Sequence, residues 1–186
     1  ALYFVDNNSQ PAFGGRLSLS FRLGETGNLT LGASGMYGTY DPDNELDYLV
    51  LGADLVLRVE KWVLRMEYLV RRTKMALSDT PEARFRYGPG ADGKFDPYQL
   101  KSGWYLETEY PVGAGFELLG RFDGMYRVGN VSQSSALRAE SLILRYTLAL
   151  SYRVVEQFRI KLSGEFYEFS DFDDEAAIHL GLVGAF

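Results

Sequence analysis

The sequence predicts an all-β fold of antiparallel strands connected up and down, and three observations support this prediction. Apolar and polar residues alternate with a period of two along most of the chain, as expected of strands that face two different environments. Most of these runs are about ten residues long, whereas strands in soluble proteins average about 5–6 residues. The connections between the runs are alternately short and long.

Nine long strands are expected from the alternation, at residues 14–23, 28–38, 48–58, 62–71, 104–110, 116–127, 141–154, 158–166 and 175–186. A short additional strand is expected at residues 2–5. In the first four long strands the apolar side carries, in order, Leu17, Leu19 and Phe21, then Leu29 and Leu31, then Leu51 and Leu55, then Trp62, Leu64 and Met66. In the last five it carries Trp104 and Leu106, then Phe116, Leu118 and Phe122, then Leu144 and Leu148, then Ile160 and Leu162, then Ile178, Leu180 and Leu182.

Four connections are short, namely those around residues 23–28, 59–61, 111–115 and 154–157. The alternate connections are residues 6–12, 41–45, 73–102, 129–140 and 170–175. In an up-and-down sheet all four short turns fall at the same end, which is the arrangement of outer-membrane barrels with short periplasmic turns. We therefore expect residues 1–186 to form a single transmembrane β-barrel domain or the C-terminal part of one, with residues 73–102 as a long extracellular loop.

The alternative of a soluble barrel or sandwich is disfavoured by the two sides of the strands. The apolar side is nearly uninterrupted over nine strands, and its large side chains would overfill the interior of a small barrel. Turned towards hydrocarbon, the same side chains need no partner, while closure of the sheet satisfies the backbone. Many aromatic residues lie near strand ends, as in interfacial girdles, although aromatic residues favour strands in general.

Composition excludes several function classes. The chain has 186 residues, no cysteine and a net charge of -6, so disulfides and thiolate chemistry are excluded and nucleic acid is not an expected partner. No run approaches the roughly 18–20 apolar residues of a membrane-spanning helix. The first residues lack the basic and apolar regions of a signal peptide, which a mature exported protein would also lack.

Four stretches resemble the C-terminal half of the phosphate-selective porin O and P family: residues 13–38, 47–73, 103–123 and 148–171, the last reading LALSYRVVEQFRIKLSGEFYEFSD. The resemblance covers nearly all of the chain and is diffuse, resting on strand patterns with glycine, arginine and aromatic positions. It implies a 16-stranded outer-membrane porin, commonly a homotrimer, that passes anions. Nine or ten strands are fewer than sixteen, so we expect the C-terminal portion of a larger barrel in preference to a small barrel with a trimmed N-terminus.

The last strand resembles the C-terminal signal that the outer-membrane barrel assembly machinery recognises. The residues that match are Phe186, Leu182 and Leu180, whereas Gly184 departs from the bulky residue usual at its position.

The polar sides of the strands are expected to enclose a lumen. Their basic residues are Arg16, Arg22, Arg58, Arg65, Arg71, Arg121, Arg127, Arg145, Arg153, Arg159 and Lys161, all of which except Arg127 we list as pore-lining. Their acidic residues are Asp54, Glu67, Glu107, Glu109, Glu117, Asp123, Glu165 and Glu175. Eleven bases minus eight acids leaves +3 on these sides, while the whole chain carries -6. A cationic wall favours anions in a pore, although pairing of these charges across the strands is the principal role expected of them.

Other chemistries are weaker interpretations of the sequence. The acidic segments 41–47 and 170–175 lack the spacing of an EF-hand calcium loop and are expected to be solvated outer loops. His179 is the single histidine and is expected mid-strand on the polar side, away from a rim where hydrolase partners would lie. Residues 87–99 are glycine-rich but lack the ending and context of a phosphate loop.

The sequence therefore predicts an outer-membrane porin of a Gram-negative bacterium that allows passive diffusion of small hydrophilic solutes, with anion preference. No catalytic residue, metal site or cofactor is expected, and the expected partners are membrane lipid, lipopolysaccharide and the assembly machinery. The alternative function is a structural or adhesive barrel that does not conduct, and a rim enzyme is the least favoured.

Overall fold

Nine long antiparallel strands form one sheet in the computed structural model, which describes residues 9–74, 76–77, 86–87, 98–128 and 141–184. The long strands are β1 (Phe13–Leu23), β2 (Gly27–Thr39), β3 (Asp47–Val59), β4 (Trp62–Lys74), β7 (Tyr98–Gly113), β8 (Phe116–Val128), β9 (Ser141–Val155), β10 (Phe158–Phe169) and β11 (Glu175–Gly184). They contain between 10 and 16 residues, so the prediction of nine long strands is confirmed. The expected short strand at residues 2–5 lies outside the described residues.

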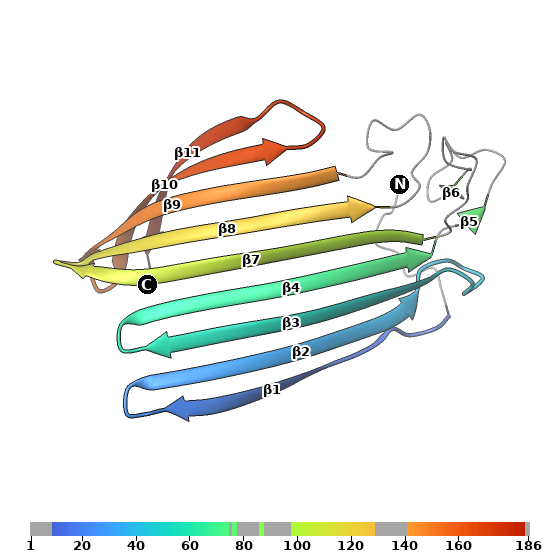
Figure 1. Ribbon diagram of the computed structural model, residues 1–186, viewed down its shortest axis with the longest axis horizontal. Coiled ribbons are helices and arrows are strands. Elements are labelled where there is room, and N and C mark those ends of the chain that lie inside the picture. The colour runs from blue at the N-terminus through green and yellow to red at the C-terminus, as the bar shows by residue number, and fades with distance from the viewer. Residues whose placement is uncertain (1–8, 75, 78–85, 88–97, 129–140, 185–186) are drawn as a thin grey trace.

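The strands lie side by side in chain order, so each long strand pairs with its neighbours in the sequence (Figure 1). The numbering of neighbouring strands skips from β4 to β7, which pair directly, because the two short strands between them in the sequence do not belong to this sheet. These are β5 (Ala76–Leu77) and β6 (Arg86–Tyr87), which pair with each other in parallel and form a separate small sheet. The up-and-down antiparallel arrangement predicted from the sequence is therefore confirmed. Within the described residues the sheet is open, with β1 and β11 as its two edges.

Tight turns join the strands at one end of the sheet, at the left of Figure 1. The connections β1–β2, β3–β4, β7–β8 and β9–β10 each contain two or three residues, as the sequence predicts. The turn between β7 and β8 passes through Gly113, Ala114 and Gly115, all with positive φ, which two glycines adopt without steric cost. At the opposite end, β4 continues to Lys74 and β7 begins at Tyr98, so both strands extend into the segment 73–102 that was expected to be loop.

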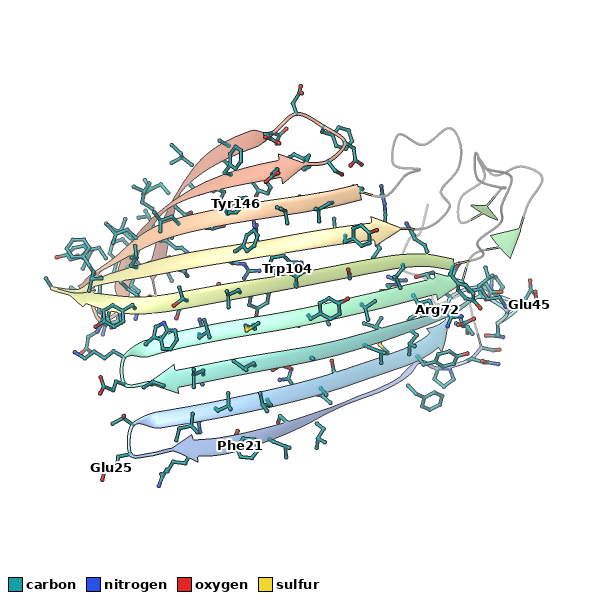
Figure 2. The ribbon with its side chains drawn as sticks, in the orientation of Figure 1. Phe21, Glu25, Glu45, Arg72, Trp104 and Tyr146 are labelled. Carbon is teal, nitrogen blue, oxygen red and sulfur yellow. The ribbon has the colours of Figure 1, made fainter. Side chains whose placement is uncertain are left out.

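The register places the predicted apolar residues on one face of the sheet, here called the apolar face. One row crosses eight strands without a break and consists of Leu19, Leu31, Leu55, Met66, Leu106, Phe122, Tyr146 and Phe166. Within it, the rings of Phe122 and Tyr146 stack at 4.8 Å, and Trp104 meets Phe122 edge-on at 4.8 Å. Trp104 and Tyr146 are labelled on this face in Figure 2.

Burial on the two faces is the reverse of that in a water-soluble sheet. On the apolar face Leu148 is 63% exposed and Ile178 is 83% exposed, and no second layer of described residues covers them. The opposite face, here called the charged face, carries Asp54 and Glu107, whose side chains are only 14% and 15% exposed. The one buried hydrophobic residue of the described chain, Ala149 at 2% exposure, also belongs to the charged face because it lies opposite Ser163 in the register. Carboxylates are ordinarily the more exposed class, so the sheet has no conventional hydrophobic core.

Candidate functional site: a ladder of charges across one face of the sheet

The charged face owes its composition to the alternation within each strand. Successive side chains of a strand project to opposite faces of the sheet, so the polar residues that alternate with apolar ones all lie on the charged face. Adjacent strands lie about 4.8 Å apart. In one register row, Arg65, Glu107 and Arg121 are direct neighbours on β4, β7 and β8. In the next row Asp123 lies opposite Arg145, from β8 and β9. Long side chains of opposite charge at this spacing can meet across the strands.

The first half of the ladder is centred on Glu107. Its Oε1 lies 2.9 Å from Nη1 of Arg65 and its Oε2 lies 3.3 Å from Nη1 of Arg121, so one carboxylate bridges two guanidinium groups. The same Nη1 of Arg65 lies 2.8 Å from Oε1 of Glu109. The Arg121 guanidinium is also stacked over the Tyr105 ring, 4.1 Å from its centroid. These contacts hold both arginine side chains against the sheet.

The second half of the ladder continues from Arg121 to β11. Nε of Arg121 lies 3.2 Å from Oδ2 of Asp123, and Oδ1 of Asp123 lies 2.9 Å from Nη2 of Arg145. Arg145 then approaches Glu165 at 3.8 Å, and Oε2 of Glu165 lies 3.6 Å from Nε2 of His179. The ion pairs therefore form a continuous chain across β4, β7, β8, β9 and β10, and the contact between Glu165 and the His179 imidazole extends it to β11.

A separate ion pair joins β1 to β3 across the intervening strand. Nη2 of Arg16 lies 2.7 Å from Oδ1 of Asp54. The two side chains meet above Gly32 of β2, where a Cβ atom would overlap the Asp54 carboxylate. A Cβ here would displace the ends of these two side chains, so the close approach of the bridge, and not the backbone angles, favours glycine at this position.

Four of the ten predicted pore-lining residues take part in these ion pairs, namely Arg16, Arg65, Arg121 and Arg145. They are matched by five carboxylates, Asp54, Glu107, Glu109, Asp123 and Glu165, so the charge of the paired set is 4 - 5 = -1. The pairing role expected for these arginines is therefore present in the structure. The positive charge that remains on this face lies outside the ladder.

Five further predicted residues gather towards the end of the charged face that bears the tight turns. They are Arg22, Arg58, Arg153, Arg159 and Lys161, and none has an acidic partner within 4.0 Å among the described residues. Arg153 and Arg159 are direct register partners and line a small cavity of about 90 Å³ together with Glu117. Two like charges side by side leave a positive field at this end.

The tenth predicted residue, Arg71, lies at the opposite end of the charged face. Its Nε donates a hydrogen bond to Thr73 at 3.1 Å, and its guanidinium lies 5.4 Å from the centre of the Tyr48 ring. In the register it neighbours Lys101, which in turn neighbours Arg127. Lys101 was missed as a site residue because residues 73–102 were interpreted as loop. The alternation of Leu100, Lys101 and Ser102 was the available signal.

Two more cations that the sequence did not assign lie at the same end, on the apolar face. The Arg72 guanidinium stacks over Tyr98 at 3.7 Å from the ring centre. Nζ of Lys74 donates to the carbonyl oxygen of Glu45 at 3.0 Å. Figure 2 shows Arg72 and Glu45 together at the end of the sheet away from the tight turns.

The acidic segment between β2 and β3 is organised by its own backbone. The Asp41 carboxylate accepts hydrogen bonds from the backbone N–H groups of Leu46 at 2.8 Å and Glu45 at 3.1 Å. Burial favours a higher pKa for Asp41, but these hydrogen bonds outweigh it and lower the pKa below its usual value. Beside it, burial first and the Asp41 charge second raise the pKa of Tyr40 to about 12, and the Tyr40 hydroxyl donates to the carbonyl of Lys74 at 2.6 Å. The Asp41 carboxylate is thus used to shape a turn.

The other acidic segment is built in a similar way. The backbone N–H of Phe169 donates to the Asp174 carboxylate at 3.2 Å, and Ser170 donates to Asp171. In the described part of the chain no three acidic or histidine side chains gather as metal ligands would.

His179 lies on the charged face in mid-strand, as predicted. Ser163 is its direct register partner on β10 and Glu165 lies nearby, so three residue types found in hydrolases are close together. No hydrogen bond joins Ser163 to His179 in these strands. The arrangement is therefore a contact between a carboxylate and an imidazole and not an activated hydroxyl.

The residues expected to form the assembly signal belong to the final strand. Leu180 and Leu182 lie on the apolar face of β11 and are well exposed. Phe186 lies outside the described residues. The described chain also contains no helix of the length and apolar character needed to cross a membrane.

Comparison of the chain with protein-family models, with curated proteins and with solved structures found no match in any of the three.

Proposed function

We propose that this chain forms the wall of an outer-membrane β-barrel pore in a Gram-negative bacterium, through which small hydrophilic solutes diffuse with a preference for anions. The observation that carries the proposal is the reversed burial of the sheet. Large apolar side chains such as Leu148 are exposed on a face that no second layer of described residues covers, while carboxylates such as Glu107 are shielded on the other. Lipid around the apolar face and water along the charged face suit both sets of side chains.

The connections support the same proposal. All four tight turns lie at one end of the sheet, and the longer connections lie at the other. This asymmetry is typical of outer-membrane barrels, in which the short turns face the periplasm. The proposed barrel requires β1 and β11 to be joined, either to each other or through further strands, because an open edge in hydrocarbon leaves backbone groups without partners. A larger porin, as the family resemblance implies, would meet this requirement.

Anion preference is proposed from the cations that the ladder leaves unmatched. Arg153 and Arg159 at one end and Arg71 and Lys101 at the other have no acidic partner in the described chain. An anion entering from either end would meet positive charge before it meets the ladder, whose paired charges nearly cancel.

A second candidate is a structural or adhesive barrel that does not conduct. The ladder from Glu109 to Glu165 favours it, because a continuous network of ion pairs can occupy a narrow lumen. The strand number of the closed barrel decides between the two, since lumen width grows with the number of strands.

Planar bilayer recordings with the protein in its full natural length test this proposal. A pore gives discrete ohmic current steps, and in a potassium chloride gradient the reversal potential has the sign of anion preference. A protein that inserts but stays silent would favour the structural alternative, and a reversal potential of the opposite sign would refute anion preference.

Substitution of Glu107 sharpens the experiment. Glu107→Gln removes one negative charge between Arg65 and Arg121, so the ladder becomes more positive and the reversal potential should shift further towards anions. Glu25→Gln, in the turn between β1 and β2, removes the same charge away from the charged face and should leave selectivity nearly unchanged (Figure 2).

A further inference from the structure

A pocket of about 140 Å³ lies on the charged face at the end away from the tight turns. Its lining residues come from two adjacent register rows and from the segment after β10. Lys101, Arg127 and Ser141 form one row, and Met125, Ile143 and Phe169 form the next, with Phe172 beyond the strand. The pocket therefore has one cationic side and one apolar side, and this division follows directly from the strand register.

The cationic side is part of a longer row of like charges. Arg71, Lys101 and Arg127 are direct neighbours on β4, β7 and β8. The nearest acid of the ladder on β8 is Asp123, two residues before Met125 along the strand. Asp123 is already paired with Arg121 and Arg145. An apolar row thus separates Lys101 from the carboxylates of the ladder, and Lys101 has no acidic partner in the described chain. The Lys101 ammonium group therefore attracts an anion.

The apolar side is formed by apolar residues that the register places on the charged face. Met125 lies opposite Ile143, which lies opposite Phe169. The Phe169 ring stacks on Tyr167 with the ring centres 6.1 Å apart and stands perpendicular to Phe172 with the centres 6.2 Å apart, so a bound ring would extend an existing aromatic cluster. A purely inorganic anion gains nothing from these four side chains, because it has no apolar surface to bury.

The size of the pocket limits what its apolar side can hold. A cavity of about 150 Å³ lined by leucine, isoleucine and phenylalanine accommodates one benzene molecule. The pocket here has about the same volume, and four of its seven lining residues are apolar, while Lys101, Arg127 and Ser141 form its polar side. One six-membered ring with a carboxylate attached matches both its volume and its two-sided character.

We propose that this pocket binds small aromatic carboxylates, of which benzoate is the simplest, as they pass along the charged face. The ring packs among Met125, Ile143 and Phe169, and the carboxylate accepts hydrogen bonds from Lys101 and Ser141. The inference names a solute class for the proposed pore and rests on that function, because the charged face must be in contact with water. It adds a requirement that a general anion pore lacks, namely discrimination between anions of equal charge by their apolar part.

The test measures benzoate binding and ionic conductance separately, on the protein in its full natural length. Equilibrium dialysis of labelled benzoate and labelled acetate against the protein in detergent micelles reports binding without any need for a pore. Benzoate should bind and acetate should not, and in planar bilayers benzoate should reduce the chloride current while equal acetate leaves it unchanged. Benzoate binding without any conductance would refute the proposed pore but not the binding site. Conductance with equal responses to benzoate and acetate would refute the binding site but not the pore.

Matched variants assign the binding to the pocket. Lys101→Met should weaken benzoate binding by about tenfold or more, as expected for loss of a charged hydrogen-bond partner. Lys161→Met, at the other end of the same face, should leave binding unchanged. Ile143→Ser should weaken benzoate binding by about fivefold through loss of apolar contact. Leu69→Ser is its control, because Leu69 belongs to the same register row but does not line the pocket.

Two results would overturn the assignment. One is equal weakening by Lys101→Met and Lys161→Met, which would indicate a general charge effect. The other is full retention of benzoate binding by Ile143→Ser in a protein that still binds benzoate in preference to acetate, since the ring would then lie elsewhere. If Ile143→Ser fails to fold, competition by benzyl alcohol in the unmodified protein replaces it: the neutral ring should displace benzoate, and failure to do so would remove the apolar half of the site.

Discussion

An arginine at Leu148 is the sharpest test of which face of the sheet meets lipid. Leu148 is the eighth of the fifteen residues of β9 and is 63% exposed on the apolar face. If that face were bathed in water, an exposed leucine could be replaced at a cost within about 0.5 kcal/mol. If it faces hydrocarbon at the middle of a membrane, Leu148→Arg should cost about 2–4 kcal/mol. The two environments therefore predict different results for the same substitution.

Depth along β9 supplies the internal control. Leu142 lies on the same face six residues before Leu148, and Val155, the register partner of Phe158, lies on it seven residues after Leu148, so each is about 20 Å away along the strand. Near the membrane interfaces arginine should cost only about 0–1 kcal/mol. The free energy of unfolding, measured by denaturant titration of the protein folded in lipid vesicles, should therefore fall most for Leu148→Arg and least for Leu142→Arg and Val155→Arg. Three equal costs below about 0.5 kcal/mol would refute the assignment of this face to lipid.

Two further predictions concern single contacts. Gly32→Ala should lower the free energy of unfolding by about 1 kcal/mol, because the new Cβ would displace the Asp54 carboxylate from its ion pair with Arg16. Gly15→Ala is the control and should not destabilise the protein, because no atom lies within 4 Å of the position of its Cβ. Equal effects of the two substitutions on unfolding in lipid vesicles would contradict the close-approach argument. Tyr40→Phe should cost about 1 kcal/mol at neutral pH, because the hydroxyl donates to Lys74. Folding raises the pKa of Tyr40 from 10.0 to about 12, so the stability that the neutral hydroxyl contributes is fully present below pH 10 and is lost as the pH rises through 12. In thermal melts at several alkaline pH values, the melting temperature of Tyr40→Phe should therefore fall less steeply with pH than that of the unmodified protein. Parallel curves for the two proteins would contradict this prediction.

The faces of the strands were predictable from the sequence because they depend on local alternation alone. Leu148 and Leu162 were assigned to the apolar side and are exposed there. His179 was placed in mid-strand on the polar side and lies there beside Glu165. Each assignment follows from the period of two within one strand and needs no knowledge of the neighbours.

The contacts between strands could not be predicted, since they depend on register. Nothing in the sequence indicates that Arg16 reaches Asp54 across Gly32, or that one carboxylate, Glu107, serves two arginines. A shift of one residue in any pair would move these side chains to opposite faces. Lys101 was missed for a different reason, because the strand continues into a segment whose glycine and proline content is typical of a loop.

The order of the strands in the sheet follows their order in the chain. This arrangement determines how the number of strands in such a sheet can change. In the described part of the chain, each long strand pairs only with the long strands before and after it in the sequence. A gene duplication that inserted one more hairpin would add a matching edge on each side and would leave every remaining pair undisturbed. Circumference could then grow in steps of two strands, with the diameter increasing roughly in proportion. If the sheet closes as proposed, barrels of several widths would follow from the same repeating unit without any change in its packing.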